Sequence, residues 1–362
     1  MLVDDQRTLK DLCEQAMQCS HCAIDTEFVW RKTYLPRIGL IQVAVPGGRC
    51  FAVDPLAISD VEPLRRLLRC PHTLKVFHSC SQDLEVLCQY CDTLPTPLFD
   101  TQVAAAFCNM GFQISYAALV ENCLCVTVDK RQQASDWCRR PLTKKQISYA
   151  LNEVSYLLDS YEVQARDLQR RNRYEWVIAQ CEQILAAFQQ ARADGELGFR
   201  NVKGHGKLSS RQLTILDNLV RWRESRAREV DLPTGWVVED RSMIEIACSE
   251  PRTPAELQDA GIVDQPTFRR YAQTLVDHVN EGLTLPSAEL IKKPVNRPPT
   301  PKQKRLIQAI LEDIATAAKD HGIAAELIAT RQDVTAFVLG KLPTLFADGW
   351  RQELELPTNR WR

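Results

Sequence analysis

The sequence predicts a mixed α/β domain followed by one or two all-α helical bundles. Over about the first 160 residues, short runs rich in β-branched and aromatic residues alternate with helical patterns. From about Thr143 onward the hydrophobic periodicity is almost entirely helical. The chain has 362 residues, which is more than one ordinary core requires and fits two or three domains.

The strands of the α/β domain are readable from short apolar runs. CAIDTEFVW is a strand interrupted by two acids, GLIQVAV ends at a Pro-Gly-Gly turn, and CFAVDP follows. A helical stretch over about 61–68 leads to the strand LKVFHS, and residues 81–90 are helical again, with Ser79 and Gln82 at capping-box spacing. Three strands joined by tight turns, then strand–helix alternation, predict a mixed sheet.

Glycine and proline mark the boundaries of the helical part. The glycine-rich segment 194–207 reads as a linker, and the four prolines at 294, 298, 299 and 301 indicate a stiff, extended spacer. We therefore expect an α/β domain with connecting helices over 1–203, a helical domain over 204–285, a proline-rich linker over 286–301 and a second, divergent helical domain over 302–362.

Composition excludes several classes of protein. Hydrophobic residues make up 45% and charged residues 25%, no apolar run reaches the roughly 18 residues of a membrane span, and the polar N-terminus is not a secretory signal. We expect a cytoplasmic protein, and a monomer. The net charge of −1 argues against indiscriminate polyanion binding. Basic residues still gather in three clusters, each of which could also be a solvated helix face: Arg166, Arg170, Arg171 and Arg173; Lys207, Arg211, Arg221, Arg223, Arg226 and Arg228; and Lys292, Lys293, Arg297, Lys302, Lys304 and Arg305.

The 14 cysteines indicate reduced structural thiols rather than a disulfide framework. Twelve precede residue 140, mostly within apolar stretches where cysteine behaves as a small hydrophobe. Two CxxC pairs occur, Cys19 with Cys22 and Cys88 with Cys91, but neither has the glycine or aromatic context of a zinc knuckle. The sequence alone assigns these pairs no role.

Asp25 and Glu27 are the first residues that suggest chemistry. They interrupt an apolar strand, where charged residues are uncommon unless something pairs with them. Residues two apart in a strand point to the same face, so both carboxylates converge on one place. Paired oxygen ligands suit a hard divalent cation such as Mg²⁺ or Mn²⁺. An edge strand with two exposed acids would have the same pattern.

Three further polar residues extend this constellation. Asp83 follows the strand LKVFHS in the first turn of the next helix, at the carboxyl end of a strand, where α/β sheets place their sites. Tyr149 and Glu153 lie four apart on a helical pattern and so share one face. Each feature alone has an ordinary alternative: an acid favoured by a helix N-terminus, or an exposed polar pair.

In this order the motifs resemble the DEDD exonuclease superfamily, in its tyrosine-containing branch, and within it the ribonuclease D family. Trp137 with the following Pro141-Leu-Thr resembles the family's approach to its third motif. Residues 208–284 resemble the helicase-and-ribonuclease-D C-terminal (HRDC) module. The matching stretches are IDTEFVWRKTYLPRIGLIQVA, VFHSCSQDLEVL, FDTQVAAAF, SYALNEVSYLL and, in the module, QLTILDNLVRWRESRAREVDLPTGWVVED.

The resemblance implies a fold and an activity. The fold is a ribonuclease-H-like exonuclease domain with a mixed sheet, followed by one or two HRDC-like helical bundles. The activity is metal-dependent 3′→5′ removal of 5′-mononucleotides from RNA, with tRNA precursors as the expected substrates. Two divalent ions about 4 Å apart would neutralise the attacking and leaving oxygens.

By the same resemblance each site residue has an expected role. Asp25 would contact both ions, Glu27 and Glu153 the ion that activates water, and Asp83 the second ion through water. Tyr149 would orient the water. Expected contacts to the terminal nucleotide are Phe28, His78 and Ser79, although His78 could equally be a satisfied strand-end histidine and Phe28 a core residue.

Glu153 departs from the family pattern, in which the fourth acid is aspartate. The extra methylene moves the carboxylate by about 1 Å, and such a displacement can change a rate on the order of 100-fold. Three explanations stay open: a site adapted to glutamate, a slow or Mn²⁺-preferring enzyme, or a domain that only binds RNA. A DNA exonuclease of the same superfamily is a further alternative.

Overall fold

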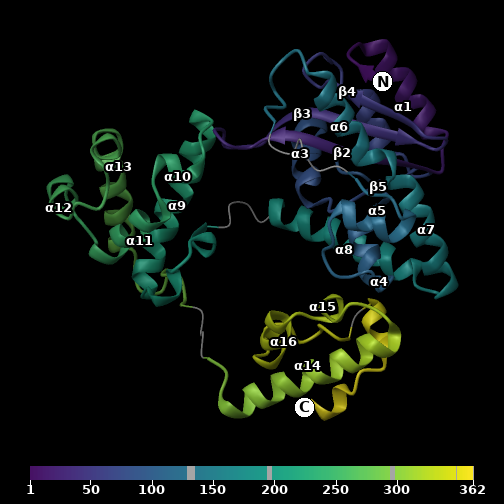
Figure 1. Ribbon diagram of the computed structural model, residues 1–362. Helices are drawn as coiled ribbons and strands as arrows, with labels where there is room; N and C mark the ends of the chain where they lie inside the picture. The colour runs from purple at the N-terminus through teal and green to yellow at the C-terminus, as the bar shows by residue number, and fades with distance from the viewer. Residues whose placement is uncertain (129–134, 194–197, 294–297, 348, 362) are drawn as a thin grey trace. The chain divides into compact units, whose positions relative to one another are not determined.

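The computed structural model describes residues 1–128, 135–193, 198–293, 298–347 and 349–361 (Figure 1). Its contacts divide the chain into two units. Unit 1 comprises Met1–Val29, Arg37–Ala186 and Pro299–Arg362, and unit 2 comprises Trp30–Pro36 and Ala187–Pro298. Within the predicted linkers, Gly195, Pro294 and Arg297 lie outside the described residues.

Unit 1 contains a six-stranded mixed sheet with the order β1-β4-β3-β2-β5-β6. The β1–β4, β2–β5 and β5–β6 pairs are parallel, and the β2–β3 and β3–β4 pairs are antiparallel. The predicted mixed sheet is therefore confirmed. The strands are β1 Leu2–Val3, β2 His21–Val29, β3 Arg37–Val45, β4 Arg49–Val53, β5 Leu74–Phe77 and β6 Leu98–Asp100.

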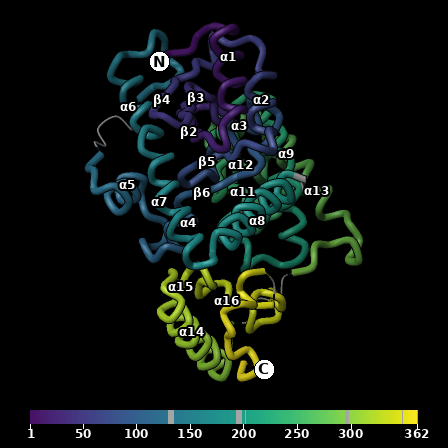
Figure 2. The backbone as a smooth tube through the Cα atoms, turned by 90° about the vertical axis from the view of Figure 1, so that its right-hand side faces the viewer, coloured from purple at the N-terminus to yellow at the C-terminus, as the bar shows by residue number. Residues whose placement is uncertain are grey.

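Helices cover both faces of this sheet, with α1–α3 on one side and α5–α7 on the other (Figure 2). Successive side chains of a strand point to opposite faces. In β2, Cys22 therefore faces Cys13 of α1, whereas His21 lies 3.9 Å from Glu162 of α7. The helices are α1 Gln6–Met17, α2 Glu62–Arg69, α3 Ser81–Cys91, α4 Thr101–Phe107, α5 Tyr116–Leu124, α6 Lys144–Ser155, α7 Leu157–Arg170 and α8 Tyr174–Ala193.

The last helices, α14 Pro301–His321, α15 Ala325–Ile328 and α16 Arg331–Val338, pack within unit 1. The Trp350 ring lies edge-on to Phe107 at 4.9 Å and stacks on Trp176 at 5.5 Å between centroids. The Trp176 indole N–H donates to Glu353 at 3.0 Å. This aromatic cluster packs Trp350 against α8 and the end of α4 within unit 1, while the likeness of residues 302–362 to an HRDC module stays a prediction.

Unit 2 is a helical bundle built on the long helix α9. Ser209 and Gln212 form a capping box at its start, and Gly282 of α13 leaves room for the backbone of Ile215, which a Cβ at residue 282 would meet at 3.2 Å. Tyr34, from the β2–β3 connection, donates its N–H to Asp231 at 3.1 Å. The helices are α9 Ser210–Val230, α10 Thr234–Val237, α11 Asp240–Ser249, α12 Pro254–Asp259 and α13 Gln265–Thr284.

No described helix is long and apolar enough to cross a lipid bilayer. Asp25 lies in β2, Asp83 in α3 and Tyr149 in α6. All three elements belong to unit 1. The candidate site can therefore be described entirely within one unit.

Candidate active site

Asp25 lies in the middle of β2 and Glu27 two residues further on, opposite Gln42 and Leu40 of β3 respectively. Both side chains are partly exposed. Burial, together with the nearby negative charges of Asp83, Glu27 and Glu153, raises the pKa of Asp25 well above its usual range. Burial and the carboxylates of Glu153 and Asp83 raise the pKa of Glu27 to about 8. The protein thus holds these acids close enough to repel one another.

Asp83 lies in the first turn of α3, as predicted, and is 6% exposed. The Thr26 hydroxyl, which lies between Asp25 and Glu27 in β2, donates a hydrogen bond to Asp83 Oδ1 at 2.5 Å. Burial raises the pKa of Asp83 to about 7, against the opposing effect of this hydrogen bond. The Thr26 contact ties the start of α3 to the strand that carries the other two acids.

Tyr149 and Glu153 are presented by α6, which contacts β2, β3 and β4. A capping box between Thr143 and Gln146 starts this helix. The Tyr149 hydroxyl donates a hydrogen bond to Glu153 one turn further on, and burial and that bond raise the pKa of the phenol. Since Glu153 also raises the pKa of Glu27, the helix brings its carboxylate to the acids of β2. The structure therefore gathers all five residues of the predicted constellation.

The donor set fits divalent cations that keep part of their hydration shell. Among the residues that the structure describes, no three His, Cys, Asp or Glu side chains form a ready-made metal cage. Mg²⁺ does not need one, because it is commonly held by one or two carboxylates, waters and substrate phosphates. The proximity of Asp25, Glu27, Asp83 and Glu153 also fits a cation site, because a bound cation would offset the repulsion among their carboxylates.

His78 and Ser79, the expected substrate contacts, have partners within the protein. His78 Nε2 donates to the Ile114 carbonyl at 3.1 Å, and its Nδ1 lies 2.9 Å from the Thr101 hydroxyl. Burial lowers the pKa of His78, which favours the neutral ring. A contact from His78 to a nucleotide would therefore have to replace one of these bonds. Phe28 is half-buried beside the acids.

The predicted Ser79–Gln82 capping box is wrong. Helix α3 begins at Ser81, its N-cap is Cys80, and no side chain caps it. Ser79 instead has a left-handed backbone, with φ of 64°, and donates its N–H to Asp100 at 2.9 Å. A carboxylate from another strand end thus replaces the local cap that the spacing suggested.

Asp100 is a residue of this region that the motif analysis did not single out. It is 3% exposed and accepts hydrogen bonds from the N–H groups of Ser79, Cys80 and Gln102 at 2.8–2.9 Å. The bonds from Ser79 and Cys80 hold the turn between β5 and α3, and hence the start of the helix that carries Asp83, and the bond from Gln102 caps α4. An aspartate that ends an apolar strand directly before a helix was the available signal.

The structure divides the predicted basic clusters into buried and exposed members. Arg223 is 4% exposed, with Asp240 and the Val238 carbonyl as partners, and Arg211 donates to three carbonyls at the end of α13. Buried Arg223 and partly buried Arg211 therefore stabilise the bundle, and the alternative of a solvated helix face does not hold for Arg223. Exposed cations include Lys292, Lys293, Lys302, Lys304 and Arg305, and also Arg269 and Arg270 of α13.

Comparison with known proteins gives matches along the whole chain. Residues 1–165 match the 3′-5′ exonuclease family profile, and residues 212–279 match the HRDC domain profile. Ribonuclease D of Escherichia coli (strain K12) is 33% identical over 363 residues, which cover 98% of this chain and 95% of the relative. Ribonuclease D of Shewanella sp. (strain ANA-3) is 32% identical over 97% of this chain and 91% of the relative.

The solved structures include the same kind of relative. The crystal structure of Escherichia coli RNase D, described as an exoribonuclease involved in structured RNA processing, matches with a TM-score of 0.89 and 31% identity. The match covers 100% of this chain and 97% of that one. With near-complete coverage by relatives above 30% identity, this chain belongs to the ribonuclease D family of 3′-5′ exonucleases.

Proposed function

We propose that the chain removes nucleotides one at a time from the 3′ end of RNA, releasing 5′-mononucleotides. The observation that carries this proposal is the gathering of Asp25, Glu27, Asp83 and Glu153, with Tyr149, in a protein of the ribonuclease D family. Water would attack the phosphorus of the last phosphodiester. The bond to the 3′ oxygen of the preceding nucleotide would break, and that oxygen would leave as a hydroxyl.

Two divalent ions would lower the pKa of the attacking water and neutralise the charge on the attacking and leaving oxygens. Asp25 would contact both ions, and the effect of both Asp83 and Glu153 on its pKa supports this role. Glu27 and Glu153 would hold the ion on the side of the attacking water, and Asp83 the other. Tyr149, which donates its hydroxyl hydrogen to Glu153 in this structure, would donate to the water oxygen and fix its direction.

The resemblance to ribonuclease D and the helical modules favours structured RNA, and we propose tRNA precursors as the substrate. We further propose that the protein works as a monomer in the cytoplasm. Exposed cations on α13 and along α14 suit phosphate contacts, which need no fixed sequence. A DNA exonuclease and a protein that only binds RNA are the two alternatives.

The direct test is incubation of 3′-labelled single-stranded RNA, and of a DNA strand of the same sequence, with Mg²⁺, Mn²⁺ or EDTA. We expect mononucleotide release from RNA with either metal and none with EDTA. Asp25→Asn and Asp83→Asn should each lower the rate by at least 100-fold, because each removes a charge that holds a cation. Asp92→Asn, at the exposed far end of α3, is the matched control and should retain the parental rate. Comparable release by Asp25→Asn would refute the assignment.

Glu153→Asp tests whether this site is adapted to glutamate. Tyr149 donates to Glu153 and Glu153 reaches the charges of β2, so the longer side chain already spans the distance from α6. Shortening it should withdraw the carboxylate by about 1 Å and lower the Mg²⁺-dependent rate, by 10-fold or more. The measurement is kcat at saturating Mg²⁺ and Mn²⁺ for both proteins, with circular dichroism as the folding control. A faster Glu153→Asp enzyme would show that glutamate is a defect.

Arg269 and Arg270 test the role of the HRDC bundle. Truncation after residue 203 would also remove Trp350, which packs against Phe107 and Trp176 in unit 1, so point substitutions disturb the protein less. Replacing both arginines with alanine should weaken binding of tRNA-sized RNA and reduce the slope of log K against log salt by about 1.4, at about 0.7 per single-strand phosphate contact.

The matched control is Arg7→Ala with Lys10→Ala, which removes the same charge from the exposed surface of α1. The affinity for a short oligonucleotide and its rate of hydrolysis should stay near the parental values in both double variants. Equal affinities and equal salt slopes for the two double variants would mean that this face of α13 does not hold RNA.

A further inference from the structure

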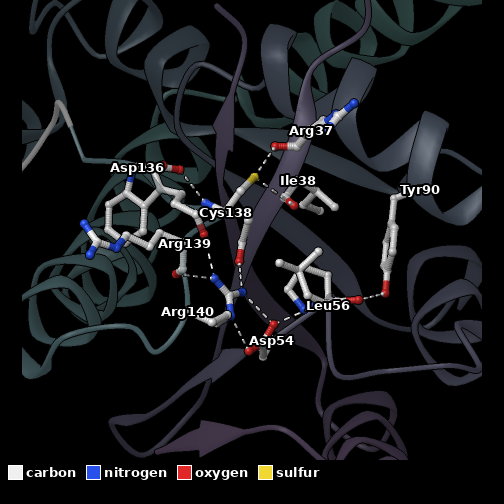
Figure 3. A network of polar contacts seen from close by, with 12 residues as sticks. Arg37, Ile38, Asp54, Leu56, Tyr90, Asp136, Cys138, Arg139 and Arg140 are labelled. Carbon is white, nitrogen blue, oxygen red and sulfur yellow. Dashed lines mark hydrogen bonds and ion pairs between the residues drawn. The ribbon is translucent and has the colours of Figure 1, made fainter. Parts of the chain in front are cut away.

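Arg140 makes an unusually complete set of contacts just before α6. Its guanidinium pairs with both carboxylate oxygens of Asp54, through Nε and Nη2, at 2.6 Å each. It also donates to the carbonyls of Gly39 and Trp137 at 2.7 Å and of Arg139 at 3.1 Å. Figure 3 shows the Arg140 guanidinium directed at Asp54, with the carbonyl groups around it. The side chains of Arg140 and Asp54 are 26% and 10% exposed, so solvent screens this pair only in part.

The partners of Arg140 belong to fixed parts of the sheet. Asp54 directly follows β4, and its N–H donates to the Val3 carbonyl of β1 at 2.8 Å. Hydrogen bonds from Arg140 hold the pKa of Asp54 below its usual range although burial opposes them. Gly39 is the extra residue of a β-bulge, since Leu40 pairs with Glu27 and Ile38 pairs with Phe28. The arginine therefore joins two strands to the segment that leads into α6.

Gly39 also explains how closely that segment approaches the sheet. A Cβ on residue 39 would lie 2.6 Å from both the Cβ and the carbonyl oxygen of Trp137. Only glycine leaves this space, and the Trp137 backbone fills it. The Trp137 ring is 1% exposed and packs with Leu40, Ala52, Ala150 and Tyr149. Its centroid lies 6.2 Å from that of the Tyr149 ring.

These contacts form a continuous path from the sheet to two residues of the proposed site. Arg140 fixes the Trp137 carbonyl, Trp137 packs against Tyr149, and Tyr149 donates to Glu153. Helix α6 starts four residues after Arg140 and rises about 1.5 Å per residue, so a shift at its start is carried along the helix to Tyr149 and Glu153. A displacement of about 1 Å at a reacting group can cost on the order of 100-fold in rate.

We propose that Arg140, paired with Asp54, is a positioning residue that sets where α6 presents Tyr149 and Glu153 to the carboxylates of β2. It does not touch substrate. The inference rests on the proposed function, because it assigns Arg140 an effect on hydrolysis through residues that carry it out. Lysine cannot replace it, since an ammonium group cannot form the two-oxygen pair and reach the Gly39 and Trp137 carbonyls together.

The experiment compares Arg140→Lys with Arg65→Lys. Arg65 of α2 is a close match: its side chain is 29% exposed, and it donates to Glu62 at 2.8 Å and to the Cys91 carbonyl at 2.7 Å, on the other side of the sheet. For a short RNA at saturating Mg²⁺, Arg140→Lys should lower kcat by 10- to 100-fold while KM changes less than about 3-fold. Arg65→Lys should retain the parental kcat. Asp54→Asn, which keeps the shape of the side chain, should lower kcat in the same way and serves if Arg140→Lys does not fold.

A double-variant cycle tests the path through the helix. Tyr149→Phe should lower kcat. Adding Arg140→Lys to that variant should lower kcat by a much smaller factor than it does in the parent, because Arg140 acts on kcat in part through Tyr149. Folded Arg140→Lys and Asp54→Asn proteins with parental kcat would overturn the inference, as would losses that multiply fully in the double variant. Full activity of Asp25→Asn would instead overturn the proposed function, so the two failures are distinguishable.

Discussion

The proximity of four carboxyl groups with little access to water is the constraint on which the candidate site of unit 1 depends. Asp25, Glu27, Asp83 and Glu153 come from a strand and two helices, and burial and proximity raise the pKa values of Asp25, Glu27 and Asp83. Folding such a group together costs free energy, because each carboxylate must either lose hydration beside like charges or take up a proton. A protein keeps such an arrangement where a cation or a substrate offsets it, and perturbed acids of this kind gather at functional sites.

Contacts that do not take part in the chemistry hold the acids in place. Thr26 ties Asp83 to β2, Asp100 fixes the turn before α3, and Arg140 fixes the segment before α6. Each links an element that carries an acid to the sheet through hydrogen bonds to charged groups, which are stronger than neutral ones. The sheet therefore fixes the positions of α3 and α6, because both helices are bonded to it near their N-terminal ends.

Local sequence patterns predicted the strands and helices that carry the site, but they could not predict contacts between residues far apart in the sequence. β2, β3, β5 and α3 have clear periodicity, and the acids stand out against apolar neighbours. β1 has only two residues, too few to show an alternation of apolar and polar side chains, and it forms a strand because it pairs with β4. The long helical region after Thr143 is three helices, α6 to α8. The capping box at Ser79 failed because Asp100, distant in sequence, satisfies that turn. Arg140 and Asp54 are 86 residues apart, so no local pattern links them.

We propose that the carboxylate cluster destabilises the folded protein without a cation and that a bound cation offsets this cost. The most direct test of this claim is the melting temperature of the parent and of Asp25→Asn, first in EDTA and then over a Mn²⁺ titration. A ligand at 100 times its Kd stabilises a folded protein by about 2.7 kcal/mol, and 1 kcal/mol is worth roughly 2–4 °C in a domain of this size. We expect Asp25→Asn to melt at or above the parent in EDTA, and the parent to gain several degrees with Mn²⁺ while Asp25→Asn gains much less. A parent that Mn²⁺ leaves unchanged, or an Asp25→Asn protein that melts well below the parent in EDTA, would contradict the account.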